Sequence, residues 1–161
     1  MTLTYGFSGA RDILEKARRD YARLLAASAS RSENALPDAL FDFAVTVFHV
    51  RDWLKHHPTA GFTPQDVETF VRSSTALSAF HDLCTASKHK QITLYRPTTF
   101  EVVASAVAPT STVLGDGAPE AVHKAFVTKV VKADASRHEA LALAAQAIAD
   151  WDAFFNEHDI Q

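Results

Sequence analysis

Hydrophobic and polar positions recur with helical spacing along most of the chain. In residues 10–28, apolar side chains lie every third or fourth position, and basic side chains fill the opposite face. Pro37, Thr63-Pro64 and the Ser136-x-x-Glu139 capping box mark helix starts, and Pro58 marks a helix end. The pattern predicts helices over about 10–28, 37–57, 64–72, 76–89 and 137–157.

The period changes after the fourth predicted helix. Segments at about 91–107 and 125–133 are rich in Val, Thr, Phe and Tyr, which favour strands. The stretch "TSTVLGDGAPEA" between them has the Gly, Asp and Pro content of an irregular loop. We therefore predict one mainly α domain over 1–161: a helical bundle of about four to five helices, with a small β-hairpin inserted before the C-terminal helix.

Composition narrows the class of protein. Hydrophobic residues make up 47% of the 161 residues, which is typical of a globular domain with one core. A formal net charge of −3 argues against a broad nucleic-acid-coating surface, although a local basic site remains compatible with it. Cys84 is the single cysteine, so an internal disulfide and a cysteine-based zinc site are excluded. With no signal-peptide pattern and no apolar run of ~20 residues, we expect a cytoplasmic protein without a membrane partner.

The second predicted helix, which contains "VTVFHVRDWLKHH", carries an unusual polar wedge on an otherwise apolar circumference. The wedge has no Lys, Glu, Arg or Gln, the residues that usually cover a solvent-facing helix. It is therefore either a plain solvent face or a hydrogen-bond network of short side chains. Arg51 projects from the apolar arc instead, and one interpretation is a structural arginine that pairs with a carboxylate from another helix. The wedge consists of Asp42, Thr46, His49, Asp52 and His56.

The fourth predicted helix has a second polar cluster, in which His81 and Lys88 share a face and His89 follows. If this helix packs against the second one, Asp52 and Lys88 are natural partners, flanked by His49 and His89. In this interpretation the cluster is a buried polar network with a purely structural role. Basic residues at a helix C-terminus also interact favourably with the helix dipole without any further role.

A metal site is one interpretation of the same residues. His49, Asp52 and His56 present two imidazoles and a carboxylate on one face, and His81 or His89 would complete the ligands for zinc, iron or manganese. However, His49 and His56 are two turns apart, ~10 Å along the helix, which is far for one ion. We therefore predict no metal and no other cofactor.

The hexapeptide "RDWLKH", Arg51 to His56, resembles the R-x4-6-H element of HEPN domains, all-helical modules of prokaryotic toxin–antitoxin and defence systems. The resemblance implies metal-independent RNA cleavage, with Arg51 stabilising the phosphate and His56 or His57 moving a proton. It also implies a homodimer. Residues five apart on a helix point ~140° away from each other, so a second subunit or a frayed helix end would bring Arg51 and the histidine together.

A longer pattern, His49-x-x-Asp52-Trp53 in "FHVRDWL" followed by "DLCTASKHK", is similar to one in small bacterial and phage proteins of no established activity. It implies no mechanism. The sequence thus favours an RNA-directed protein of a defence or toxin-type system. The alternative is a non-catalytic interaction or scaffold module with a protein partner and a structural His49–Asp52–Lys88 core. Whether the chain is an enzyme is left open.

Overall fold

A computed structural model describes residues 5–29, 34–56, 61–88, 99–107, 123–131 and 137–160 of the chain. This part of the protein is mainly helical and contains five helices. They are α1 (Ala10–Ser28), α2 (Ala35–Lys55), α3 (Pro64–Ser73), α4 (Thr75–Lys88) and α5 (Ala140–Glu157).

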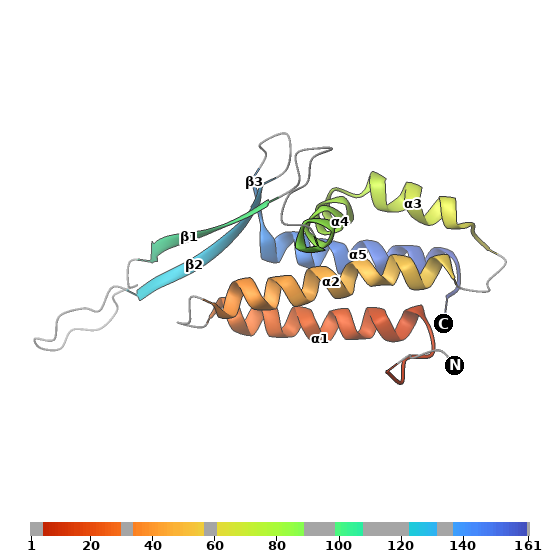
Figure 1. Ribbon diagram of the computed structural model, residues 1–161, viewed down its shortest axis with the longest axis horizontal. Helices are drawn as coiled ribbons and strands as arrows, with labels where there is room; N and C mark the ends of the chain where they lie inside the picture. Colours follow the sequence, from red (N-terminus) through yellow and green to blue (C-terminus); the bar gives the residue numbers. More distant parts are fainter. Residues whose placement is uncertain are drawn as a thin grey trace, which may run out of the picture.

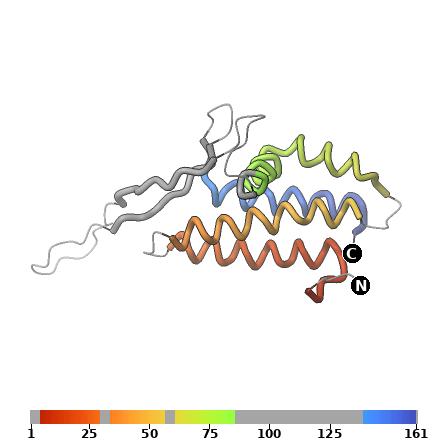
Figure 2. Tube along the Cα trace, viewed as in Figure 1, coloured from red at the N-terminus to blue at the C-terminus, as the bar shows by residue number. Residues whose placement is uncertain are grey.

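Three long helices form the body of the bundle. α1 and α2 run antiparallel side by side, and α5 lies along them (Figure 1). α3 and α4 cover the bundle from one side, with α4 steeply inclined to α2 (Figure 1). The start of α1 and the end of α5 lie at the same end of the bundle (Figure 2).

Aromatic side chains fill the centre of this arrangement. Phe43 of α2 meets Phe80 of α4 edge to face, with 5.0 Å between ring centroids. Trp151 of α5 is fully buried, and its indole N–H donates to the Val47 carbonyl oxygen at 3.1 Å. That bond satisfies the one polar atom of the Trp151 ring, so α2, α4 and α5 share a single core.

Local signals explain where most of the helices begin. The Thr63 hydroxyl accepts from the Asp66 N–H at 3.2 Å, and the Asp66 carboxylate accepts from the Thr63 N–H at 2.7 Å, which is a capping box. Ser74 is the N-cap residue of α4, because its hydroxyl accepts from the Leu77 N–H at 3.0 Å. α2 begins at Ala35, two residues before Pro37, and this still leaves Pro37 in the first turn, where no N–H is needed.

Extended backbone occurs in three segments, Thr99–Val107 (β1), His123–Val131 (β2) and Arg137–Glu139 (β3). They pair antiparallel in the order β1-β2-β3, with Phe100 and His138 both opposite Val130. The two-stranded hairpin predicted before the last helix is therefore not supported, because β2 has a neighbour on each side.

The predicted start of the last helix differs from the structure. A helix from 137 was expected on the Ser136-x-x-Glu139 pattern, but Arg137–Glu139 is extended and α5 begins at Ala140. Glu139 has φ −65° and ψ 123°, and within the described ranges no side-chain hydrogen bond caps the helix there. Arg137–Glu139 pairs antiparallel with β2 instead, so tertiary pairing overrides the local signal.

Candidate functional site

Arg51 is the predicted site residue with the most closely defined surroundings. Its side chain retains only 16% exposure, and its Nη2 donates to Glu68 of α3. Its Nη1 donates to the Asp52 carboxylate at 3.0 Å, and its Cζ lies 5.0 Å from the centre of the Phe48 ring. Glu68 is thus a carboxylate from another helix that pairs with Arg51, as the structural interpretation of this arginine predicts.

Glu68 balances two cations of α2. Its Oε1 accepts from Arg51 and also from the Lys55 ammonium at 2.7 Å. Burial of the Glu68 carboxyl raises its pKa, but hydrogen bonds and charge attraction from Arg51 and Lys55 outweigh burial and lower the pKa to about 2. Glu68 is therefore ionised across the physiological pH range, and it fixes the last turns of α2 against α3.

One polar atom of Arg51 has no counterpart in this network. Its Nε is buried and has no hydrogen-bond partner among the described residues. Arg51 also lines a void of about 10 Å³ whose other lining residues, including Phe80 and Trp151, are apolar. A buried donor without a partner is costly.

His81 of α4 lies close to the same group. Its ring centroid is 5.4 Å from that of Phe48, the ring over which the Arg51 guanidinium lies. Its Nδ1 is 3.2 Å from the Asp82 carboxylate. A carboxylate oxygen can only accept here, so Nδ1 carries the proton in this contact and Nε2 is the nitrogen left for another partner.

These side chains surround a cavity of about 350 Å³ where α2, α3 and α4 meet. It offers two guanidiniums, an imidazole and a hydroxyl, set against one carboxylate that Arg51 and Lys55 already hold. Arg72 is exposed and forms no ion pair with any residue that the structure describes. Arginine forks match the geometry of phosphate oxygens, so the cavity is chemically suited to an anion. The residues that line it are Arg51, Glu68, Val71, Arg72, Ser78 and His81.

His56, one of the two predicted catalytic histidines, lies elsewhere. His56 is the exposed C-cap residue of α2 and is not among the residues that line the cavity. His57 and His89 lie outside the described residues. The helix bearing Arg51 therefore does not by itself bring His56 into this cavity.

The polar wedge of α2 divides into two parts. Asp42 and His49 are exposed, and the Asp52 side chain is 42% exposed while it accepts from Arg51. Thr46 is only 4% exposed, and its hydroxyl donates to the Asp20 carboxylate of α1. Lys88 ends α4, but its side chain is outside what the structure describes, so the Asp52–Lys88 pair stays a prediction.

Asp20 is a buried carboxylate that the sequence analysis did not single out. It is 1% exposed and accepts from Lys16 at 2.7 Å, from Arg23 and from Thr46. These donors satisfy the buried charge, so this group joins α1 to α2 rather than offering a site.

In the described ranges, no three His, Cys, Asp or Glu side chains come together as a metal would require. Over the same ranges, none of the helices combines the length and apolar character needed to cross a bilayer.

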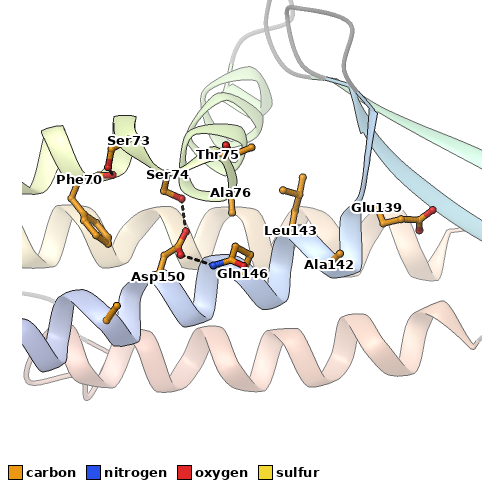
Figure 3. Close-up of a pocket in the computed structure, with 11 residues that line it drawn as sticks. Phe70, Ser73, Ser74, Thr75, Ala76, Glu139, Ala142, Leu143, Gln146 and Asp150 are labelled. Atoms are coloured by element: carbon orange, nitrogen blue, oxygen red, sulfur yellow. Dashed lines mark hydrogen bonds between the residues drawn. The ribbon is translucent and has the colours of Figure 1, made fainter.

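A second, shallower cavity of about 760 Å³ lies between the α3–α4 junction and α5 (Figure 3). Its centre is Asp150, which accepts from Ser74 and, at 2.7 Å, from the Gln146 amide. The remaining charged lining residue is Glu139. This cavity presents carboxylates and hydroxyls, with no cation among the described residues that line it, so it is not suited to an anion.

Two residues of the Arg51 cavity, Glu68 and Arg72, were missed by the sequence analysis. They are four residues apart on α3, as Arg51 and Lys55 are on α2, so each pair shares one helix face. This i,i+4 spacing on both helices was the sequence signal for the cavity. It identifies Glu68 and Arg72 only once the packing of the two faces against each other is known.

No protein-family model matches this chain, and neither the curated proteins nor the solved structures contain a match to it.

Proposed function

We propose that the protein acts on RNA and that the cavity between α2, α3 and α4 binds a phosphate group of the RNA backbone. The observation that carries this proposal is the convergence of Arg51, Arg72, Ser78 and His81 on one cavity of about 350 Å³. The resemblance of "RDWLKH" to the HEPN element supplies the prokaryotic defence or toxin-type setting. In that setting the chain works without a metal ion.

The two arginines have different tasks in this proposal. Arg51 is held by Glu68 and Asp52, which use two of the five guanidinium N–H groups and pre-orient the fork. Arg72 is exposed, so it is available to a ligand without first breaking an ion pair in the described part of the chain. A preorganised donor next to an available one is an arrangement that favours phosphate recognition.

A localised site also agrees with the charge of the chain. A net charge of −3 does not support non-specific coating of nucleic acid. Binding through one cavity requires only a few phosphate contacts, so we expect modest affinity and a shallow dependence on salt concentration.

The test compares two exposed arginines. Fluorescence anisotropy with a labelled single-stranded RNA in EDTA is measured for the wild-type protein, for Arg72→Ala and for Arg19→Ala. Arg19 is exposed on α1 and does not line the cavity, so it is the matched control for the loss of one positive charge. We expect Arg72→Ala to weaken binding about tenfold and to reduce the slope of log affinity against log salt by about 1.

Equal weakening by Arg72→Ala and Arg19→Ala would reject the cavity as the binding site. No detectable binding by the wild-type protein would reject the RNA-directed function itself.

A second candidate function rests on the Glu68 network. Arg51 and Lys55 share the Glu68 carboxylate, as expected if these charges only join α2 to α3. The protein would then be an interaction or scaffold module, with its exposed histidines on a binding surface. Failure of RNA binding, together with retention of fold in Arg72→Ala, would favour this second function.

The pairing of Arg51 with His56 or His57 also belongs to the proposal. A homodimer would supply the histidine from a second copy. Analytical ultracentrifugation tests this directly, because a monomer at micromolar concentration would leave Arg51 without such a partner.

A further inference from the structure

The cavity contains a histidine that the HEPN-like hexapeptide does not include. His81 lies on α4, whereas the resemblance placed the proton-transfer group at the end of α2. His81 lines the same cavity as Arg51, and its side chain is 35% exposed, so water or a ligand can reach it. His56 does not line the cavity.

Asp82 gives His81 a defined orientation. With Nδ1–H donating to Asp82 at 3.2 Å, the ring has one hydrogen-bonded nitrogen and one available nitrogen, Nε2. A carboxylate that fixes one nitrogen of an imidazole also stabilises the imidazolium that forms when the other nitrogen takes a proton. A histidine that merely covers a surface has no need of this arrangement.

Phe48 relates His81 to Arg51. The ring of Phe48 contacts the guanidinium of Arg51 and the imidazole of His81, at 5.0 Å and 5.4 Å from its centroid. Both functional groups are therefore held by one partly buried aromatic side chain in addition to their carboxylates. Contact with the same ring limits how far the two groups move relative to each other, and a defined geometry favours proton transfer at a bound phosphate.

Charged groups from each neighbouring helix face this imidazole. Arg51 comes from α2, Glu68 and Arg72 come from α3, and Asp82 comes from α4 itself. The two guanidiniums would stabilise negative charge that develops on a phosphate, and Glu68 is already engaged by Arg51 and Lys55.

We infer that His81, positioned by Asp82, is the proton-transfer residue for cleavage of an RNA phosphodiester held in the Arg51 cavity. This inference rests on the proposed function. The ribose 2′-hydroxyl gives its proton to Nε2 of His81, and its oxygen forms a bond to phosphorus. The bond from phosphorus to the 5′-oxygen breaks, and that oxygen takes a proton from water. The hydroxide formed then takes the proton from Nε2 of His81, which restores the neutral imidazole. The products are a 2′,3′-cyclic phosphate and a 5′-hydroxyl, and the step needs no metal, oxidant or further reactant.

The experiment measures cleavage of a single-stranded RNA in EDTA and, separately, binding of the same RNA carrying a 2′-deoxy substitution at the cleaved position. The variants are His81→Ala, with His49→Ala as the matched control and His56→Ala as the competing assignment. His49 is exposed on α2 and does not line the cavity. We expect His81→Ala to lower the cleavage rate about 100-fold, with RNA affinity changed less than about threefold. We expect His49→Ala to cleave at the wild-type rate.

Two further readouts separate chemistry from structure. Imidazole added to the buffer should restore part of the cleavage by His81→Ala, which a structural defect would not allow. Asp82→Asn should lower the rate about tenfold or more, while Asp82→Glu should recover much of it, with RNA binding unchanged in both.

The outcomes are distinct. Loss of activity in His56→Ala with wild-type activity in His81→Ala would overturn the assignment of His81. RNA binding by the wild-type protein without any cleavage would overturn the inference and leave the proposed RNA-directed function in place. Absence of both binding and cleavage would reject both.

Discussion

The guanidinium of Arg51 on α2 donates to the carboxylate of Glu68 on α3, and the same Glu68 oxygen accepts from Lys55. The three groups are largely removed from water, with side-chain exposures of 16%, 17% and 29% for Arg51, Glu68 and Lys55. Electrostatic interactions are less screened there than on an open surface. This network holds the wall of the Arg51 cavity, so it links the stability of the bundle to the geometry of the site.

Glu68→Gln should destabilise the protein in a pH-dependent way. The folded-state pKa of Glu68 is about 2, below its ordinary value of 4.5, so the stabilisation is present above pH 4.5 and is lost as the pH falls toward 2. At neutral pH we expect a loss in the free energy of unfolding on the order of 2–3 kcal/mol. Urea denaturation at several pH values measures it.

Glu15→Gln is the control for that experiment. Glu15 pairs with Arg18 on the surface of α1 and is 48% exposed, so its removal should cost less than about 1 kcal/mol. A Glu68→Gln penalty that stays constant from pH 7 to pH 2 would contradict the ion-pair account.

Asp20→Asn should weaken the contact between α1 and α2. Asp20 accepts from Lys16, Arg23 and Thr46, and an amide loses the charge that strengthens those three bonds. We expect a cost of about 2 kcal/mol in the free energy of unfolding. Asp42→Asn, a matched change on the exposed face of α2, should stay within about 0.5 kcal/mol. Similar effects from both substitutions would be inconsistent with a buried role for Asp20.

Ser74→Ala should cost about 1–2 kcal/mol, because the hydroxyl both caps α4 and donates to Asp150 of α5. Among the described residues, the adjacent Ser73 hydroxyl donates to the Phe70 carbonyl alone, on the exposed side of α3. Ser73→Ala should therefore leave the melting temperature nearly unchanged. If the two variants melt together, Ser74 does not cap α4 as described.

Trp151→Phe should destabilise the core by about 2–3 kcal/mol. The substitution removes the indole N–H that donates to the Val47 carbonyl and leaves a smaller ring in a fully buried position. Trp53, which is only half-buried on α2, provides the control, and Trp53→Phe should cost less than half as much. Chemical denaturation followed by far-UV circular dichroism measures both variants, and equal losses would argue against the Trp151 hydrogen bond.

Helix positions could be predicted because they depend on local patterns. The apolar stripe of α1 and the Thr63–Asp66 capping box of α3 are interactions between residues a few positions apart. The start of α5 was not predictable in this way. There a local capping signal competes with pairing between β2 and β3, and nothing in the sequence ranks one above the other.

The candidate site could be predicted only in part, for a similar reason. Arg51 stood out because a cation in an apolar arc requires a partner, and His81 stood out as a titrating group on a second helix. Which carboxylate serves Arg51 depends on which face of α3 meets α2, so Glu68 and Arg72 could not be assigned. The burial of Thr46 depends in the same way on Asp20 from α1.

The most direct measurement of the central claim is a titration of ¹⁵N-labelled protein with single-stranded RNA, followed through the arginine Nε–Hε signals. If a phosphate group occupies the cavity, the Arg51 and Arg72 signals should shift together and saturate, while those of Arg19 and Arg23 on α1 stay in place. Shifts confined to the α1 arginines, or no shifts at a concentration that saturates binding, would contradict the account.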